Sequence, residues 1–284
     1  MRFEVGNIRV TRVRESASTV PLLGMFPLAD AALIELHRDW LMPEYVDDVG
    51  DLTLSIHALV LESMGKTIVI DTCVGERPVP GYEALSNRET TFLADFAAAG
   101  FDVNAVDVVM CTHLHFDHVG WNTQFVDGTW VPTFPNARYL FNRTEYDYWD
   151  GGAGGFAVTF DTAVRPVVEA GLVDFVDESY RITDEIGFEL TPGHSPGHMS
   201  VRLSSGGDEA VITGDMVHHP IQFVAPHWQM SADDDPPRAA STRTAFRDRY
   251  ADTAVRVFGT HFGGSSCGHL RTNGDSFRFD PFTP

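Results

Sequence analysis

The sequence predicts an α/β fold in a single domain of 284 residues. Segments with strand-like alternation are followed by segments with helical spacing in two successive halves of the chain, which is typical of sheets covered by helices. The segment "VDVVMCT" (106–112) is a short continuous apolar run, as expected of a strand buried on both faces. No stretch reaches the roughly 18 consecutive apolar residues of a membrane span, so we expect a soluble protein with no membrane partner.

The first half of the chain contains clear strand signals. Residues 2–13 alternate apolar and polar side chains, and residues 52–72 read as two strands joined by a turn at Met64–Gly65. Apolar residues at helical spacing predict a helix over residues 87–100, in which Gly100 suits the position just after the last turn. This order of strands and helix matches the first half of an α/β domain.

The second half repeats this order. A hairpin is predicted at residues 199–215, with its turn at Gly206–Gly207, and a helix that starts with proline is predicted at residues 236–252. Further strand signals lie at residues 137–141, 186–191 and 254–261, the last of which we expect to close the fold.

Residues 19–50 interrupt this alternation with an apolar segment rich in proline and aromatic residues. The segment either packs as a lobe on the core, or forms a lid over the active site or an interface between subunits. Large apolar insertions often mark such functional surfaces. A homodimer is the assembly that the interface interpretation would give.

The charge and the cysteine content limit the partners and the compartment. The formal net charge of −20 disfavours nucleic acid and anionic membrane surfaces, because binding to phosphate groups depends on Lys and Arg. The three cysteines, Cys73, Cys111 and Cys267, are widely spaced and form no CxxC pair, so neither a disulfide framework nor a zinc ribbon is indicated. The N-terminal segment lacks the apolar run of a secretory signal. We therefore expect a cytoplasmic protein.

The strongest chemical signal is "CTHLHFDHVG" (111–120), which places His113, His115, Asp117 and His118 at the end of the buried strand. In an extended chain alternate side chains share a face, so the first three would project together. A turn after Asp117 would bring His118 to the same cavity. Imidazoles and a carboxylate in this arrangement suit zinc or a similar divalent ion. A purely structural role explains so dense a cluster poorly.

Further candidate ligands lie at other strand ends. "TPGHSPGH" (191–198) offers His194 and His198 in a turn fixed by proline and glycine. "VITGDM" offers Asp215, and "FGTHFGG" offers His261. Strand ends that are distant in the chain meet at one rim of an α/β scaffold, so we expect these residues to join one site.

These motifs, in this order and together with "VIDTC" upstream, resemble those of the metallo-β-lactamase superfamily over roughly residues 52–262. The resemblance implies a four-layered αββα sandwich with a dinuclear metal site at the edge of the two sheets. It also implies two sets of ligands that share one bridging residue. The sets are His113, His115 and His194 for one ion, Asp117, His118 and His261 for the other, and Asp215 as the bridge.

The resemblance also implies the reaction. Aspartate rather than cysteine at the bridging position is similar to the glyoxalase II, lactonase and organophosphate hydrolase branches. Two divalent ions lower the pKa of a shared water to near neutrality, so a bridging hydroxide can attack a carbonyl carbon or a phosphorus. Asp117 would orient this hydroxide and shuttle its proton. Asp117 and Asp215 are therefore the expected catalytic residues, and two divalent ions, zinc before iron, manganese or cobalt, are the expected cofactors.

Residues next to the ligands are expected to orient them or to line the pocket. Asp71 and His198 are candidate hydrogen-bonding partners of the ligands, and direct metal binding is the alternative for His198. His218 takes the position at which lactonases of the superfamily have a tyrosine that assists the substrate, and His218 or His219 is expected to border the pocket. An ordinary place in the core is the alternative for aromatic residues. Candidates for an apolar substrate wall are Trp121, His227 and Trp228.

The leading hypothesis is a dinuclear metal-dependent hydrolase that opens a small lactone or cleaves another small ester. Thioester, phosphotriester and β-lactam hydrolysis are alternatives on the same site, because these activities share metal ligands and differ in pocket shape. Thioester cleavage of the glyoxalase II type is less favoured, since no cluster of Lys and Arg closes the chain. An iron-dependent oxidoreductase of the same fold is the alternative from another class.

Overall fold

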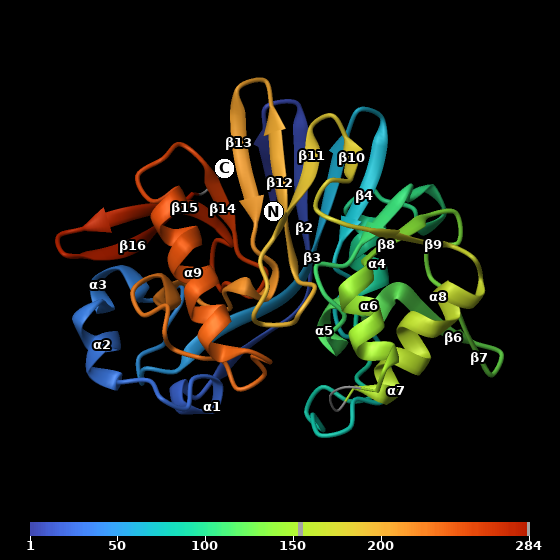
Figure 1. Ribbon diagram of the computed structural model, residues 1–284. Helices are drawn as coiled ribbons and strands as arrows, with labels where there is room; N and C mark the ends of the chain where they lie inside the picture. Colours follow the sequence, from blue (N-terminus) through green and yellow to red (C-terminus); the bar gives the residue numbers. More distant parts are fainter. Residues whose placement is uncertain (153–155, 283–284) are drawn as a thin grey trace.

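Two seven-stranded sheets pack face to face at the centre of the molecule, and helices cover their outer faces (Figure 1). The structure is a computed structural model that describes residues 1–152 and 156–282. The strands of the first sheet, in spatial order, are β1 (Arg2–Val5), β2 (Ile8–Val20), β3 (Leu52–Ser63), β4 (Lys66–Ile70), β5 (Val108–Met110), β8 (Arg138–Asn142) and β9 (Val173–Val176). Those of the second sheet are β10 (Arg181–Thr183), β11 (Ile186–Leu190), β12 (Met199–Ser205), β13 (Asp208–Ile212), β14 (Arg256–Phe258), β15 (Cys267–Asn273) and β16 (Ser276–Pro281). This is the αββα sandwich that the motifs predicted.

The helices are short except for α9 (Pro236–Tyr250), which lies on the second sheet (Figure 1). The others are α1 (Leu22–Met25), α2 (Ala31–Leu36), α3 (Arg38–Leu41), α4 (Phe92–Ala98), α5 (Phe116–Val119), α6 (Arg143–Asp150), α7 (Ala157–Thr159) and α8 (Arg165–Glu169). A small hairpin of β6 (Thr123–Val126) and β7 (Thr129–Pro132) forms a separate two-stranded sheet. Within the described ranges, no helix combines the length and the apolar character that a membrane span needs.

The strands next to the centre of the first sheet are buried on both faces. In β5, Val108 and Met110 enter the core between the sheets, where Ile212 of β13 also lies. Val109 points to the other side and packs in a second core, together with Phe92 and Phe96 of α4. A strand covered on both faces needs apolar residues at every position. The continuous apolar run of the sequence therefore reflects its place in the middle of four layers.

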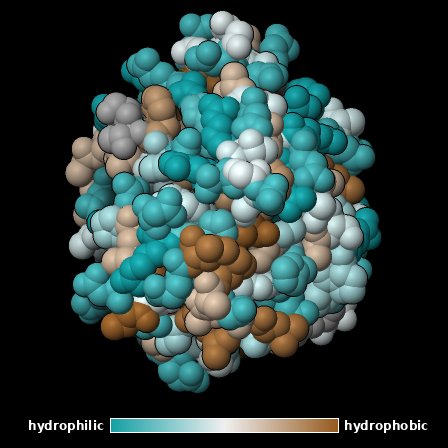
Figure 2. Space-filling model, turned by 90° about the vertical axis from the view of Figure 1, so that its left-hand side faces the viewer, coloured by the Kyte–Doolittle hydropathy of each residue, from teal (hydrophilic) through white to brown (hydrophobic). Residues whose placement is uncertain are grey.

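The outer face of the second sheet is covered by α9 and by the segment of residues 19–50. Phe246 of α9 packs in the same core as Phe26 and Trp40 of that segment. The segment also leaves apolar side chains in solvent. These exposed residues are Leu23, Leu28, Leu36 and Val49. Figure 2 views the molecule from the side that carries α2 and α3, where apolar groups gather in the middle and lower part of the surface. The lid and the interface stay predictions for this segment.

Several predicted turns are confirmed in detail. Met64 and Gly65 have φ values of 50° and 79°, and Gly206 and Gly207 have φ values of 61° and 93°. Two successive positive φ values are the geometry that two-residue hairpin loops prefer. Gly100 follows α4 with a φ of 100°, as expected of a glycine just beyond a helix end.

Two predictions of local structure are wrong. The chain is extended only as far as His115, because the short helix α5 begins at Phe116 and carries Asp117 and His118. The strand predicted at residues 254–261 does not close the fold. It forms β14, which lies between β13 and β15, and a further hairpin of β15 and β16 follows it.

Candidate metal centre

The strands β5, β11, β13 and β14 end at one rim of the sandwich, close to α5 and α1 in the lower part of Figure 1. Each is followed by candidate ligands. The segment after β5 carries His113 and His115, and the connection from β11 to β12 carries His194. Asp215 lies in a 3-10 turn, Gly214–Met216, directly after β13, and His261 follows β14. The topology thus gathers residues from both halves of the chain.

The first group of ligand atoms, which we call the three-histidine group, consists of His113, His115, His194 and Asp215. The Nε2 atom of His194 lies 2.9 Å from Nδ1 of His115. The Oδ2 atom of Asp215 lies 3.6 Å from Nε2 of His194 and 3.8 Å from Nε2 of His113. All four side chains are buried.

The second group, which we call the two-histidine group, consists of Asp117, His118, His261 and again Asp215. The Nε2 atoms of His118 and His261 are 3.3 Å apart. Asp215 Oδ2 lies 3.1 Å from Nε2 of His118, and Asp117 Oδ2 lies 3.5 Å from Nε2 of His261. Asp215 therefore stands between the two groups and belongs to both.

The donor sets fit two divalent ions. A tetrahedral zinc ion with bonds of about 2.0–2.1 Å separates its ligand atoms by roughly 3.3–3.4 Å, close to the distances within each group. The Nε2 atom of His113 is buried and has no hydrogen-bond partner among the described residues. Leaving such a nitrogen without a partner costs free energy. An ion at this position would satisfy it.

Most of the ligand imidazoles are held by a partner on the far side of the ring. Asp71 Oδ2 accepts from His118 Nδ1 at 2.9 Å, and the same carboxylate accepts from the backbone N–H of Thr112 at 2.8 Å. The Nδ1 atom of His261 lies 3.2 Å from the carbonyl oxygen of Ser55. Partners of this kind fix the tautomer and the orientation of a metal-binding ring.

Asp233 holds the imidazole of His194, and the sequence analysis missed it. Its Oδ1 atom accepts from His194 Nδ1 at 3.0 Å, and its Oδ2 atom accepts from Arg243 at 3.0 Å. Burial alone would raise the pKa of Asp233, but the hydrogen bond from His194 and the charge of Arg243 lower it to about 2. Asp233 is one of three successive aspartates, Asp233–Asp235, and nothing in the sequence distinguishes it from its neighbours.

His198 lies beside the three-histidine group but does not belong to it. Its Nδ1 atom is 2.8 Å from Thr191 Oγ1, and its Nε2 atom accepts from the backbone N–H of Asp215 at 2.9 Å. Both ring nitrogens are therefore engaged, which leaves neither for an ion. The structure thus contradicts direct metal binding by His198 and places it where it holds Asp215.

The electrostatics differ between the two groups. Burial and neighbouring imidazoles lower the pKa of His113 and His115 well below the usual range, so both rings stay neutral. Despite burial, the carboxylate of Asp215 raises the pKa of His118 and of His261, so these two rings would have to release a proton to bind an ion. Burial would raise the pKa of Asp215, but His118 and His261 hold it well below its ordinary value. Metal ions bind neutral imidazoles and ionised carboxylates.

A cavity of about 270 Å³ opens above the two groups. Five proposed ligands contribute to its lining, namely His115, Asp117, His194, Asp215 and His261. Val20, Gly24 and Met25 from the segment of residues 19–50 contribute to its wall, as do Leu54 and Ile56 of β3. The lining is therefore polar at the metal groups and mostly apolar around them.

Three aromatic side chains form one wall of this cavity, and the sequence analysis singled out none of them. The ring centroids of Tyr82 and Phe116 are 4.5 Å apart, and those of Phe116 and Phe156 are 5.4 Å apart. Phe116 lies inside the histidine motif. An apolar residue between two ligands was the one signal in the sequence that could have pointed to an apolar wall beside the metal centre.

Four of the residues predicted to border the pocket lie away from it. Trp121 is buried and donates from Nε1 to Glu15 at 2.7 Å, and Trp228 is buried in the core under α9. His219 is buried and its Nε2 donates to a backbone carbonyl, whereas His227 is exposed. The predicted substrate wall of Trp121, His227 and Trp228 is therefore wrong, because closeness to a motif in sequence does not fix the face that a side chain occupies.

His218 does line the cavity. Its Nε2 atom lies 3.2 Å from Asp215 Oδ2, and its ring is parallel to that of His261 at an angle of 3°. Neither ring nitrogen of His218 has a hydrogen bond of good geometry among the described residues, although both are buried. The ring therefore lies beside the shared carboxylate at the wall of the cavity.

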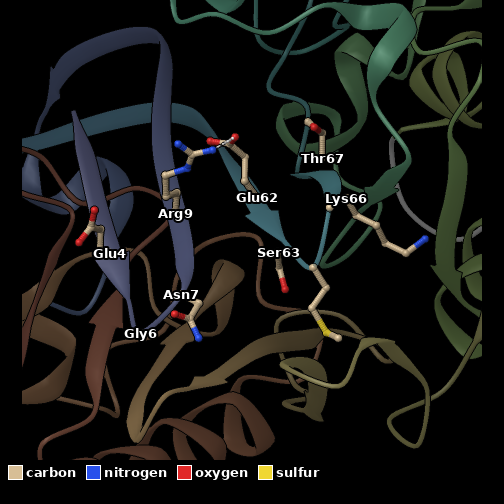
Figure 3. Close-up of a pocket in the computed structure, with 10 residues that line it drawn as sticks. Glu4, Gly6, Asn7, Arg9, Glu62, Ser63, Lys66 and Thr67 are labelled. Atoms are coloured by element: carbon tan, nitrogen blue, oxygen red, sulfur yellow. Dashed lines mark hydrogen bonds and ion pairs between the residues drawn. The ribbon is translucent and has the colours of Figure 1, made fainter.

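A second hollow lies at the opposite ends of the strands and does not share this chemistry (Figure 3). It has a volume of about 490 Å³ and is formed by the turns after β1 and β3. Arg9 and Glu62, which are paired on the neighbouring strands β2 and β3, point toward each other at one side of it and form an ion pair at 2.5 Å, so their charges are already matched. The hollow has no histidine in its lining. Its larger volume does not make it the better candidate.

Comparison with known proteins agrees with the geometry. The sequence profile of the Metallo-beta-lactamase superfamily matches residues 52–275. Among curated proteins, an N-acyl homoserine lactonase named AttM from Azorhizobium caulinodans is 31% identical over 161 residues, which are 53% of this chain and 54% of that protein. The chain spans about half the length of the curated relatives it matches.

Two solved structures resemble the whole fold. The hydrolase AbOPH, described as belonging to the beta lactamase superfamily, superposes with a TM-score of 0.82 at 22% identity, covering 100% of this chain and 97% of that one. AidC, described as a dizinc quorum-quenching lactonase in complex with a product, has a TM-score of 0.79 at 21% identity, covering 100% and 97%. Likeness at this level of identity establishes the shared fold.

Proposed function

The chain belongs to the metallo-beta-lactamase superfamily, and we propose that it is a two-metal hydrolase that opens small neutral lactones or cleaves small neutral esters. One observation carries the proposal. Two groups of ligand atoms share Asp215 at one side of a mostly apolar cavity of about 270 Å³. The names of the relatives, which include an N-acyl homoserine lactonase, support the same class of substrate.

The proposed ligands follow from the two groups. His113, His115 and His194 would hold one ion, and Asp117, His118 and His261 would hold the other, with Asp215 shared between them. Imidazole and carboxylate donors suit zinc, and iron, manganese or cobalt are further options. When bound, two such ions supply a deprotonated water at neutral pH and polarise the oxygen of a carbonyl group.

The side chains around the metal groups would orient the substrate, transfer a proton and exclude water. Asp117 is the least buried ligand, and its carboxylate faces the cavity, so it can accept a proton there and return it to the leaving oxygen. His218 lines the cavity beside Asp215, where its ring can contact a polar group of the substrate. Tyr82, Phe116 and Phe156 pack against each other and keep water away from the apolar part of a substrate.

The charge of the cavity favours a neutral substrate. None of the described residues that line it is Lys or Arg, so a carboxylate or phosphate group on a substrate would find no cationic side chain there. A compact lactone or ester with an apolar acyl group meets these conditions.

The test combines metal content with a panel of substrates. Purified protein is analysed by mass spectrometry for zinc, iron, manganese and cobalt, and turnover is measured on a lactone, an aryl ester, a thioester, a phosphotriester and a β-lactam. We expect about two divalent ions per chain and turnover of lactone or ester that a chelator abolishes and zinc restores. Iron with oxygen uptake and no hydrolysis would overturn the proposal, as would turnover confined to the thioester, phosphotriester or β-lactam.

A further inference from the structure

Glu145 of α6 is a buried carboxylate for which the proposed reaction has no use. It is 0% exposed, and no Lys or Arg among the described residues is one of the groups that act on its carboxylate. Burying a carboxylate without a cation is costly unless hydrogen bonds stabilise it. Burial raises the pKa of Glu145, and the hydrogen bonds that it accepts oppose that rise.

The hydrogen bonds of Glu145 join the two segments that carry the three-histidine group. Its Oε1 atom accepts from the backbone N–H of Leu114 at 3.2 Å, between His113 and His115. Its Oε2 atom accepts from the backbone N–H of Gly197 at 2.9 Å, three residues after His194. One carboxylate thus ties a loop of the first sheet to a loop of the second sheet.

The packing around α6 reinforces this connection. Trp149, one turn further along the helix, donates from Nε1 to Glu145 Oε1 at 2.7 Å and packs against the ring of His115 at 5.2 Å between centroids. A Cβ atom at Gly197 would lie 2.4 Å from the backbone nitrogen of Glu145. The loop that carries His194 therefore sits directly on the start of α6, with no space for a side chain.

We propose that Glu145 is a positioning residue that sets the distance between His113, His115 and His194 and thereby the metal affinity of the three-histidine group. The proposal rests on the proposed function, because it assumes that this group binds an ion. The two-histidine group does not depend on Glu145, since His118 is held by Asp71 and His261 by the backbone of Ser55.

The chain offers a matched control in Glu15. This carboxylate also accepts two backbone N–H groups, from Val74 and Gly75 at 3.0 Å each, and a tryptophan Nε1–H at 2.7 Å. The segment that it holds contains no proposed ligand. Glu145→Gln and Glu15→Gln therefore remove similar sets of hydrogen bonds, and only the first touches the three-histidine group.

The experiment measures zinc affinity of the metal-free protein by competition with a chelating dye, together with urea unfolding. Each variant is made in two backgrounds. His261→Ala leaves the three-histidine group intact, and His194→Ala leaves the two-histidine group intact. We expect Glu145→Gln to weaken zinc binding about 10–100-fold in the His261→Ala background and to leave it unchanged in the other. Glu15→Gln should leave the affinity of the three-histidine group unchanged.

The outcomes separate this inference from the proposed function. An unsubstituted chain that binds fewer than two zinc ions would remove the proposed metal centre itself. Two zinc ions in that chain, with unchanged affinity in Glu145→Gln, would overturn the role of Glu145 alone, and so would equal losses in Glu145→Gln and Glu15→Gln. If Glu145→Gln does not fold, Gly197→Ala displaces the same loop from the other side, and an unchanged affinity of the three-histidine group in that variant would also refute the inference.

Discussion

Replacing Asp233 by alanine should destabilise the protein through a buried charge that loses its partner. The guanidinium of Arg243 is 1% exposed, and Asp233 Oδ2 is the carboxylate that it contacts, at 3.0 Å. Alanine would also remove the acceptor of His194 Nδ1. Hydrogen bonds to charged groups contribute about 1.5–3 kcal/mol each, and removing one partner of a buried ion pair costs about 3–5 kcal/mol. We therefore expect a loss of about 3–5 kcal/mol in the free energy of unfolding.

The assay is urea unfolding of the metal-free protein, followed by circular dichroism. Asp234→Ala is the control, because this neighbouring carboxylate is exposed and its removal should cost less than about 0.5 kcal/mol. Asp233→Leu combined with Arg243→Met should lose less than Asp233→Ala alone, since an apolar pair leaves no buried charge unpaired. A loss below about 1 kcal/mol in Asp233→Ala would refute this account of the ion pair.

Three further predictions concern the cavity and its support. His218→Phe should lower kcat/KM on the best lactone or ester about 10–100-fold through loss of a polar contact, without changing the metal content, and equal rates would contradict that contact. Tyr82→Ala should raise KM for substrates with a large apolar acyl group by about tenfold and leave KM for a short acyl group nearly unchanged, as steady-state kinetics would show. Gly120→Ala should give metal-poor or insoluble protein, because its Cβ atom would lie 1.8 Å from the carbonyl oxygen of Val74. Gly24→Ala, whose nearest contact is 3.8 Å away, should keep its metal, and loss of metal in both variants would speak against a local clash.

The sequence predicts an element of the fold well where the burial of that element produces a recognisable pattern of apolar residues. The strand of residues 108–110 is covered on both faces, so its position could be predicted from an apolar run alone. The helix α5 could not be predicted in this way, because four residues are too few for a helical period. Its form depends on the surrounding packing, in which Gly120 approaches the backbone of Val74.

The residues of the site also divide into those that the sequence predicts and those that only the structure shows. His113 to His118 could be recognised because the histidines are dense in sequence, and His194 and His261 because they stand in motifs at strand ends. Asp233 and Glu145 are single acidic residues in acidic stretches, and only the three-dimensional arrangement shows that they contact the loops of the ligands. The partners of ligands come from other elements than the ligands, so local sequence does not contain them.

The charges of the centre lead to a last prediction about stability. Asp71, Asp117, Asp215 and Asp233 lie in or next to the two groups, and Arg243 is the one Lys or Arg that forms an ion pair with any of them among the described residues. Buried like charges repel each other, so bound divalent cations should stabilise the fold. Zinc at about 100 times its Kd adds about 2.7 kcal/mol per site, which for two sites corresponds to a rise in Tm on the order of 10 °C. Calorimetry with and without zinc measures this rise, and His113→Ala should remove about half of it because it disables one group only. A Tm that does not respond to zinc would contradict the claim that bound cations stabilise these carboxylates.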